Sequence, residues 1–438
     1  MIGRIITGVL VFAAVIAAVV TGGRLIAQDA PASQSTTVSV APARQDVACP
    51  GPLVTPAKGA SSDAELGGAA TGISRDTFLT GNVRTMGSGQ ASDAIVGSAV
   101  EHVTGGDITG LAAVTCATPR TDQWIVAGAT TVGASARLVL SNPAAVAVEA
   151  TVTAYGEIGE LDTRQVAIEP DAQQMVLLEG LTIDVAALSV HITATGTGVV
   201  AALQDSRLTG FQPSGTDWAT ASAQGTQLAI PGVGTAGSAT QTATVRLLAP
   251  EGATASMTLS TPTGETDWEG VAALKLEPGV AVEVAIPAVD VGTVTITSDA
   301  NVVAGAVVTR TRAATAGVAG DIAKEFRWIP AQLAADDNER SAVAVGYNEQ
   351  VVVYAQQPGT FALTDSDGNA LGSAQLAAGA TATIPVNVPP GTVLTASGPF
   401  AWSVLVSDGD FLAAMAPVRT TIDNVDIVVE QRRYVPSP

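Results

Sequence analysis

Charged and aromatic side chains are scarce in this chain of 438 residues. Only 14% of its residues are charged, against about 25% in an average soluble protein, and 4% are aromatic. Lysine occurs only at Lys58, Lys275 and Lys324. The 20 basic and 40 acidic residues give a formal net charge of −20, which repels nucleic-acid phosphates and excludes nucleic acid as a partner. We interpret this charge as a source of solubility; recruitment of divalent cations or of a basic partner is the alternative.

Histidine is almost missing, with His102 and His191 as the two examples. Neither has neighbouring carboxylates in the arrangement of a catalytic triad. The motifs H-E-x-x-H, G-x-S-x-G and G-x-x-x-x-G-K-[ST] do not occur. We therefore predict no catalytic residues, no cofactor, no metal ligands and a protein that is not an enzyme. A carboxylate pair for glycoside hydrolysis stays open, since it requires only a spatial separation.

One acidic run, Asp365-Ser366-Asp367-Gly368-Asn369, looks like a calcium loop. It departs from the EF-hand pattern, because Ala370 stands where the sixth position needs glycine and Leu376 where the twelfth needs glutamate. Asp-Gly pairs are also ordinary hairpin chemistry. We predict a turn at this run rather than a metal site.

Three long stretches resemble one another, at residues 138–178, 245–286 and 351–386. Each has alternating apolar and polar residues, then a proline-containing turn, then a glycine-bearing hairpin. The spacing between copies is close to the length of one β-sandwich of about 100 residues. The pattern predicts an all-β fold with three tandem Ig-like β-sandwich repeats after an N-terminal transmembrane helix.

The turns and loops divide the chain into predicted segments. A tryptophan opens each predicted repeat, at Trp124, Trp218 and Trp328, and we expect all three to be core anchors. The predicted segments are a signal anchor (1–27), a disordered Pro/Ser/Thr-rich stalk (28–48), an irregular disulfide-closed segment (49–119), repeat one (120–212), repeat two (213–318) and repeat three with the C-terminal tail (319–438).

Residues 5–23 carry no charge and lie between Arg4 and Arg24. As a helix they would span about 28 Å, close to a hydrocarbon core of about 30 Å. The flanking charges favour a single-pass cell-membrane protein with a cytoplasmic N-terminus and an extracytoplasmic body. The alternative is a cleaved signal peptide and a secreted body.

Cys49 and Cys116 are the only cysteines. Because an isolated pair in an exported chain usually forms a disulfide, we predict that these two are bonded. Closing a loop of this length contributes about 4 kcal/mol in the chain-entropy treatment.

Trp268 interrupts the repeat pattern just after a predicted hairpin. We expect it to be exposed, and an exposed indole can stack on a sugar, which makes Trp268 a candidate glycan contact. The alternative is an indole folded back over its own hairpin.

The signal anchor, the Cys49-Pro50-Gly51-Pro52 start, and Trp124 leading through residues 138–143 into an alternating strand carry a resemblance. The chain resembles actinobacterial membrane-anchored proteins known only as a domain of unknown function. The resemblance implies a place in the envelope of a Gram-positive cell and brings no catalytic residues.

The leading functional hypothesis is a non-enzymatic structural or scaffolding protein of the cell envelope. Its expected partners are the membrane, through the N-terminal helix, and wall glycans or envelope-assembly proteins. A carbohydrate-binding module array acting on wall glycans is the first alternative. An envelope hydrolase or transferase is the second.

Overall fold

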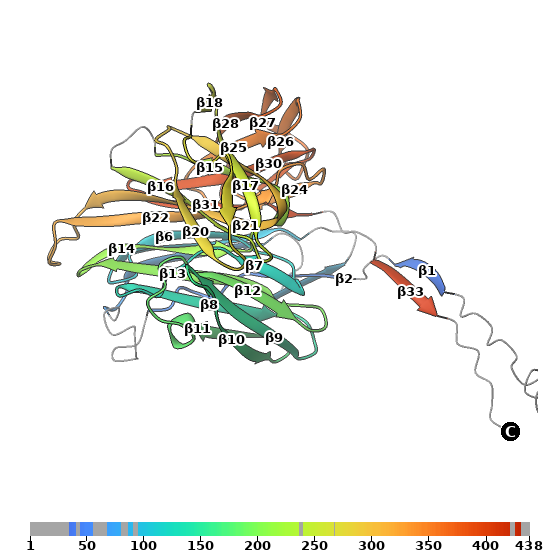
Figure 1. Cartoon of the computed structure of the whole chain (residues 1–438), viewed down its shortest axis with the longest axis horizontal. Helices are drawn as coiled ribbons and strands as arrows, with labels where there is room; N and C mark the ends of the chain where they lie inside the picture. The colour runs from blue at the N-terminus through green and yellow to red at the C-terminus, as the bar shows by residue number, and fades with distance from the viewer. Residues whose placement is uncertain are drawn as a thin grey trace, which may run out of the picture. The chain divides into compact units, whose positions relative to one another are not determined.

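A computed structural model describes most of the chain after the predicted anchor (Figure 1). The predicted anchor (1–27) lies outside the described residues. Among the described residues, no helix is long and apolar enough to cross a membrane. The described ranges are 35–40, 44–55, 68–79, 86–90, 95–235, 240–266, 268–420 and 425–430.

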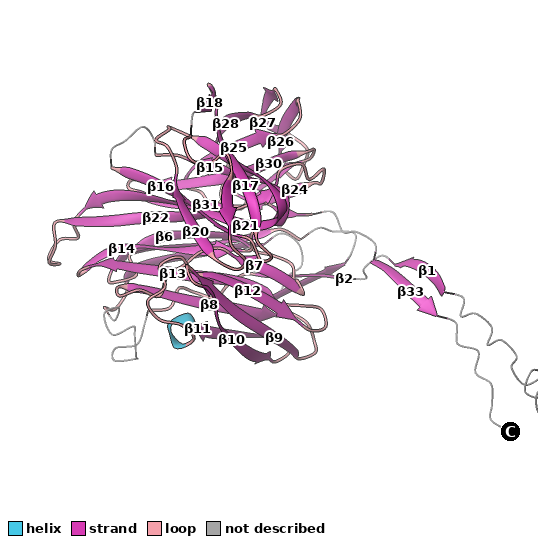
Figure 2. Ribbon diagram, viewed as in Figure 1, coloured by secondary structure: helices cyan, strands magenta, loops and turns pink. Residues whose placement is uncertain are grey.

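Nearly all regular structure in the described ranges is antiparallel β-sheet (Figure 2). The one helical element there is a single 3-10 turn, η2 (Leu178–Gly180). This confirms the prediction of an all-β fold. It follows from a composition rich in valine and threonine, which suit a pleated, half-buried surface.

The described residues fall into two compact units. In one, β1 (Ser35–Val40) pairs antiparallel with β33 (Val425–Glu430). The other contains every described residue from 44 to 420, beginning with β2 (Arg44–Ala48), which pairs with β4 (Met86–Gln90). Both β1 and β2 lie in the segment 28–48, so the prediction of a wholly disordered stalk was wrong. Their partners are distant in the chain, and local composition does not reveal them.

The first β-sandwich has sheets of order β10-β9-β12-β7 and β11-β8-β13-β14. Alternation places Val148, Ala150, Val152 and Ala154 of β9 in the core. The strands are β7 (Asp122–Ile125), β8 (Ala134–Asn142), β9 (Val148–Gly156), β10 (Gly159–Ile168), β11 (Ala172–Leu177), β12 (Ser189–Ala194), β13 (Val200–Thr209) and β14 (Gln212–Thr220).

In the second sandwich, one strand of 22 residues, β21 (Gly292–Ala313), serves both layers. Its residues 293–298 pair with β17 and β15, and its residues 303–313 pair with β16 and β22. The other strands are β15 (Gln224–Val233), β16 (Gln241–Leu248), β17 (Ala253–Thr261), β18 (Gly264–Thr266), β19 (Leu274–Leu276), β20 (Ala281–Ala285), β22 (Ile322–Pro330) and β23 (Gln332–Leu333).

The third sandwich has sheets of order β27-β26-β29-β24-β32 and β28-β25-β30-β31. Leaving out β32, its pairing order matches that of the first sandwich strand for strand. The strands are β24 (Arg340–Val343), β25 (Asn348–Ala355), β26 (Gly359–Thr364), β27 (Ala370–Leu376), β28 (Ala380–Val386), β29 (Val393–Ala396), β30 (Phe400–Asp408), β31 (Phe411–Met415) and β32 (Val418–Arg419).

Two of the predicted boundaries differ from the observed sheets. β14, which contains Trp218, completes a sheet of the first sandwich, beyond the boundary predicted at 212. β22, which contains Trp328, pairs with β21 of the second sandwich, beyond the boundary predicted at 318. These tryptophans therefore close a sandwich instead of opening the next one. Both side chains are buried, as expected for core anchors.

The segment predicted to be irregular (49–119) contains a three-stranded sheet of β3 (Thr71–Leu79), β5 (Gly97–Gly105) and β6 (Gly110–Thr115). Strand β6 is buried on both faces. Leu111 joins the core of the third sandwich, whereas Ala112 packs with Val139 and Trp218 of the first. This sheet is therefore a wedge between two sandwiches, which explains its small, apolar composition.

A disulfide joins Cys49 to Cys116, with their Cα atoms 4.4 Å apart, as predicted. We expect thiol labelling without reductant to detect neither cysteine, and labelling after denaturation and reduction to detect both. Replacing both by serine should lower the free energy of unfolding by about 4 kcal/mol, because the loop is no longer closed in the unfolded chain. Labelling of either thiol in the exported, unreduced protein would contradict the prediction.

Candidate functional site

The two histidines lie in different sheets and have different neighbours. His102 on β5 is largely buried, with Nδ1 3.4 Å from Asp408 Oδ2 and its ring 4.6 Å from that of Phe411. Burial lowers the pKa of His102, and Asp408 opposes that shift. His191 on β12 stacks on Trp124 at 4.2 Å and contacts Asp122 at 3.2 Å. Each histidine has one carboxylate partner and packs on an aromatic ring, which is a structural arrangement.

The acidic run at Asp365 forms a closed turn. The Asp365 carboxylate accepts hydrogen bonds from the backbone N–H groups of Asp367 and Asn369 and from the Asn369 side chain. These hydrogen bonds lower the pKa of Asp365. The bond from the Asn369 side chain has the largest effect. Among the residues that the structure describes, no group of three His, Cys, Asp or Glu side chains could hold a metal ion.

Trp268 is half-buried rather than fully exposed. Its indole packs against the core of the second sandwich, next to the strand pair that it follows. Burying a large aromatic side chain is strongly favourable, and the neighbouring hairpin offers an apolar surface for it. Trp268 is therefore not the fully exposed indole that we expected, and the glycan contact stays a prediction.

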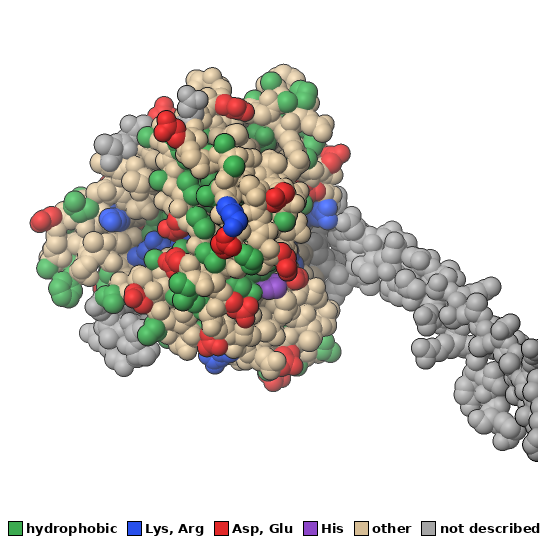
Figure 3. All heavy atoms as spheres, viewed as in Figure 1, with side chains coloured by type: hydrophobic (Ala, Val, Ile, Leu, Met, Phe, Trp, Pro, Cys, Tyr) green, Lys and Arg blue, Asp and Glu red, His purple; other side chains and the backbone are tan. Residues whose placement is uncertain are grey.

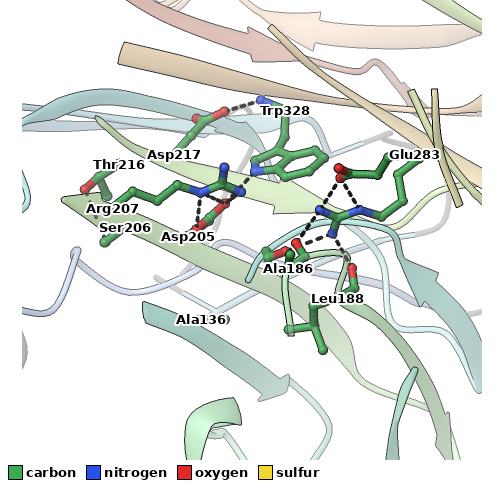
Figure 4. A network of polar contacts seen from close by, with 12 residues as sticks. Ala136, Ala186, Leu188, Asp205, Ser206, Arg207, Thr216, Asp217, Glu283 and Trp328 are labelled. Carbon is green, nitrogen blue, oxygen red and sulfur yellow. Dashed lines mark hydrogen bonds and ion pairs between the residues drawn. The ribbon is translucent and has the colours of Figure 1, made fainter. Parts of the chain in front are cut away.

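A buried polar network, which no sequence motif indicates, lies between the first two sandwiches (Figure 4). Asp205 on β13 is fully buried and binds Arg207 through two nitrogens, at 3.0 and 2.7 Å. Its Oδ2 also accepts a hydrogen bond of 2.8 Å from the Trp328 indole on β22. Nearby, Asp217 accepts a 2.7 Å hydrogen bond from the Trp328 backbone. Strand β22 of the second sandwich is therefore held by two acids of the first.

Arg246 makes the reverse connection, from β16 of the second sandwich to carbonyl groups of the first. Its guanidinium donates to Gly128 O at 2.8 Å, to Ala186 O at 3.0 Å, and to Leu188 O. It also donates to Glu283 Oε1 from two nitrogens, at 3.0 and 2.7 Å. Only 2% of the Arg246 side chain is exposed. All of these contacts are needed, because a buried guanidinium without acceptors is strongly destabilising.

The indole of Trp328 lies between these two arginines. The guanidinium of Arg246 is 5.0 Å from the ring, and that of Arg207 is 5.7 Å from it. Such cation–π contacts strengthen when they are screened from water. The network therefore joins the two sandwiches through charge, hydrogen bonds and packing at once.

Two buried carboxyl groups on adjoining strands have strongly raised pKa values. Burial raises the pKa of Asp217 on β14 well above its usual range, against backbone hydrogen bonds from Trp328 and Trp218. Burial raises the pKa of Glu325 on β22 in the same way, opposed by Arg312. The charge of Asp217 also raises the pKa of Glu325, and the charge of Asp205 raises the pKa of Asp217. Asp217 accepts a hydrogen bond from a strand of the second sandwich, and Glu325 accepts one from Leu111 N in the wedge sheet, so both groups hold neighbouring parts of the unit together.

A cavity of about 290 Å³ is lined by all four parts of the larger unit. It contains Arg120, which precedes β7, together with Arg340 on β24, Arg419 on β32 and one carboxylate, Asp336. On the face shown in Figure 3, basic side chains are few and separate, which sets this grouping apart. Among the cavities lined by described residues, it is the strongest candidate for a binding site. This cavity could not be predicted from the sequence, because its lining residues are far apart in the chain. Each arginine taken alone resembles a solvated surface residue.

A family model described as a family of unknown function (DUF5719) matches residues 68–389. The match covers more than half of the chain, so the chain belongs to this family. The family is of unknown function, as the resemblance implied. Neither an actinobacterial origin nor a membrane anchor follows from the match.

No curated protein matches the chain. A solved structure titled as the BSP domain of a biofilm-associated protein is 11% identical, with a TM-score of 0.15, covering 81% of this chain and 67% of that one. A tetra-tandem repeat from the extending region of a large adhesion protein is 12% identical, with a TM-score of 0.11, covering 83% of this chain and 92% of that one. At these TM-scores neither likeness bears on fold or function.

Proposed function

We propose that this member of a family of unknown function is a non-enzymatic structural protein of the cell envelope, built from three Ig-like sandwiches joined into one block. The observation that carries the proposal is the junction around Arg246 and Trp328. Domains linked in series usually move relative to one another unless their interface is large and well packed. Here a buried arginine of one sandwich binds three carbonyl groups of another. A block of this kind presents fixed surfaces, which suits a scaffold.

An extracytoplasmic place for the block is part of the proposal. The disulfide between Cys49 and Cys116 supports it, because structural disulfides persist in oxidising compartments and are rare in the cytosol. The uncharged stretch 5–23 supports attachment to the membrane. The proposed partners are wall glycans or envelope-assembly proteins. A carbohydrate-binding array needs exposed aromatic rings, and Trp268 offers a partly buried one.

Attachment to the membrane is tested by fractionating cells and shaving the intact cells with protease. We expect the full-length protein in washed membranes, and we expect protease added outside to degrade the body. The reason is the length and lack of charge of residues 5–23. A mature form that begins near Ser33 and is free in the medium would contradict the anchor.

The non-enzymatic role is tested separately, by incubating the purified protein with purified cell wall. We expect it to sediment with the wall, or with envelope proteins bound to the wall, without releasing soluble sugar fragments. A boiled sample controls for trapping in the wall mesh. Steady release of new reducing ends would overturn the structural role in favour of a hydrolase.

A further inference from the structure

We propose that one end of the first sandwich docks an envelope protein whose contact surface is apolar and flanked by lysine or arginine side chains. The envelope location comes from the structural role proposed above, and the inference rests on that role in this respect. The four most exposed large apolar side chains of the described residues carry the argument, and we call them the apolar loop end. They are Ile158 at 86%, Val132 at 81%, Phe211 at 74% and Ile183 at 70% exposure.

The strand pairing places all four side chains in loops at the same end of the sandwich. In one sheet β8 begins beside the end of β13, because Ala134 pairs with Arg207. In the other sheet β12 begins beside the end of β9, because Ser189 pairs with Tyr155. Residues 126–133 run from β7, which pairs with the start of β12, to the start of β8, so both sheets share this end. Loops at one end of a β-sandwich commonly form a binding surface.

Hydrogen bonds fix the loop of Val132 to the loop of Ile183. The backbone N–H of Thr130 donates to Val185 O at 2.8 Å, and that of Asp184 donates to Thr130 O at 3.0 Å. Asp184 also has a φ of 60°, in the left-handed region that residues with side chains seldom adopt. Surrounding structure must hold such a backbone, so Ile183 is presented from a loop of fixed shape.

A carboxylate fixes the hairpin of Ile158 to the same loop. Glu157 Oε1 accepts hydrogen bonds from the backbone N–H groups of Ala186 and Ala187, at 3.0 and 2.7 Å. Ile158 follows Glu157 in the two-residue turn between β9 and β10. Turn positions favour glycine, proline, asparagine, aspartate and serine, so the turn itself gives no reason for an isoleucine.

The β13–β14 hairpin, which carries Phe211, adjoins the loop of Val132. The backbone N–H of Leu208 donates to Gly133 O at 2.6 Å. A cavity of about 310 Å³ lies between these loops and strands of the second sandwich, and the paired side chains of Arg246 and Glu283 help to line it. A pocket of this size accepts one large apolar side chain of a partner, which is the arrangement of an interface hot spot. The apolar residues that line it are Ala129, Val132, Ala134, Ala186, Leu208 and Val307.

Folding alone does not account for the apolar loop end. Apolar side chains left in water contribute nothing to the hydrophobic effect. Single exposed ones are ordinary, whereas a cluster of them marks a surface that another molecule covers. Val146, at 59% exposure, lies apart from this group, in the turn between β8 and β9 at the opposite end of the sandwich.

The charges beside the apolar loop end identify the occupant. Glu157, Glu160 and Asp184 are exposed carboxylates there. The nearby guanidinium groups of Arg207 and Arg246 are already paired with carboxylates. A second copy docking through the same end would bring these acids against their own copies, and anionic lipid would present phosphate of the same sign. A partner with lysine or arginine around an apolar centre has the complementary charge.

The first test is photo-crosslinking in cells that make the full-length protein. A photo-crosslinking amino acid replaces Ile158 or Phe211, and the matched control replaces Val146. We expect positions 158 and 211 to crosslink to one and the same protein, and position 146 not to crosslink to it. Mass spectrometry of the linked peptide should find apolar residues with lysine or arginine within a few positions of them.

The second test titrates a synthetic copy of that linked peptide into the purified full-length protein. We expect Ile158→Ser and Phe211→Ser each to weaken binding about tenfold or more, with unchanged unfolding temperatures because both side chains are exposed. Val146→Ser is the control and should bind like the wild type. The double variant Glu157→Gln with Asp184→Asn keeps the hydrogen-bonding oxygens and removes both charges. It should weaken binding at low salt and change it little at about 1 M salt, where charges are screened.

Four results would overturn the docking surface. These are no crosslink at positions 158 and 211, crosslinks there to lipid or to a second copy, a linked peptide without basic residues, or equal losses in Ile158→Ser and Val146→Ser. The structural role fails separately. Release of reducing ends from purified wall would overturn that role while the crosslinks at 158 and 211 persist, whereas wall binding without release and without those crosslinks would overturn the docking surface alone.

Discussion

Replacing Arg246 with methionine should lower the free energy of unfolding by about 3–5 kcal/mol, the range for breaking a buried charged contact. Methionine fills much of the same space but donates no hydrogen bond. The carbonyl groups of Gly128, Ala186 and Leu188 would then lose the donor they share in the buried junction. The Trp328 indole would lose a cation 5.0 Å away. Denaturant unfolding, followed by tryptophan fluorescence, measures the loss.

Two further variants decide which contact matters. Glu283→Gln keeps an acceptor for Arg246 and removes only the ion pair. Because 38% of the Glu283 side chain is exposed, we expect a loss below about 1 kcal/mol. Arg164→Met, on the exposed face of β10, controls for the loss of a cation and should change little. A small effect of Arg246→Met would show that packing alone joins the sandwiches, and it would remove the main support for a rigid block.

Much of the fold could be predicted from local pattern. Apolar residues at every second position, such as Val148, Ala150 and Val152, indicate a strand with one buried face. This pattern recurs along the chain at about the length of one β-sandwich. The Asp365 turn follows from local hydrogen bonding, which needs only neighbouring residues. The disulfide was predictable because an isolated pair of cysteines has only one way to pair.

Partners across long sequence distances could not be predicted in this way. The alternation in β14 and β22 identifies strands, but it does not say whether they close one sandwich or open the next. A long strand such as β21 looks like two shorter ones, because its pattern changes where it passes from one layer to the other. The pairing of β1 with β33 joins opposite ends of the chain.

The candidate site was hidden for a similar reason. Arg120 and Arg340 each stand in a polar context that is typical of a solvated surface, and nothing local indicates convergence. Arg246 likewise gave no signal, since its acceptors are backbone carbonyls, which every residue possesses. Side chains that bind backbone groups of a distant domain leave no residue-type motif in a single sequence.

The buried carboxyl of Asp217 should make the protein lose stability as pH rises. Below about pH 4 the group is protonated in both the folded and the unfolded chain, so it contributes no difference. Above that pH the unfolded chain releases the proton, whereas the folded protein keeps it because burial raises the pKa of Asp217. Each further pH unit, up to the raised pKa, then favours unfolding by about 1.4 kcal/mol. The same sign holds for Glu325, whose pKa burial also raises.

Asp217→Asn removes this pH-dependent cost and keeps an oxygen that can accept the hydrogen bond from the Trp328 backbone. We expect the variant and the wild type to be about equally stable at pH 4. As the pH rises above 4, the variant should become progressively more stable than the wild type, up to the raised pKa of Asp217. Chemical denaturation at each pH unit from 4 to 8 measures the difference, and Asp321→Asn, at an exposed position, is the control that should show none. A difference that does not grow with pH would mean that Asp217 is already ionised in the folded protein. The acid would then be held as an anion by the charge of Arg327, and the junction would depend on buried charges instead of a neutral, hydrogen-bonded carboxyl.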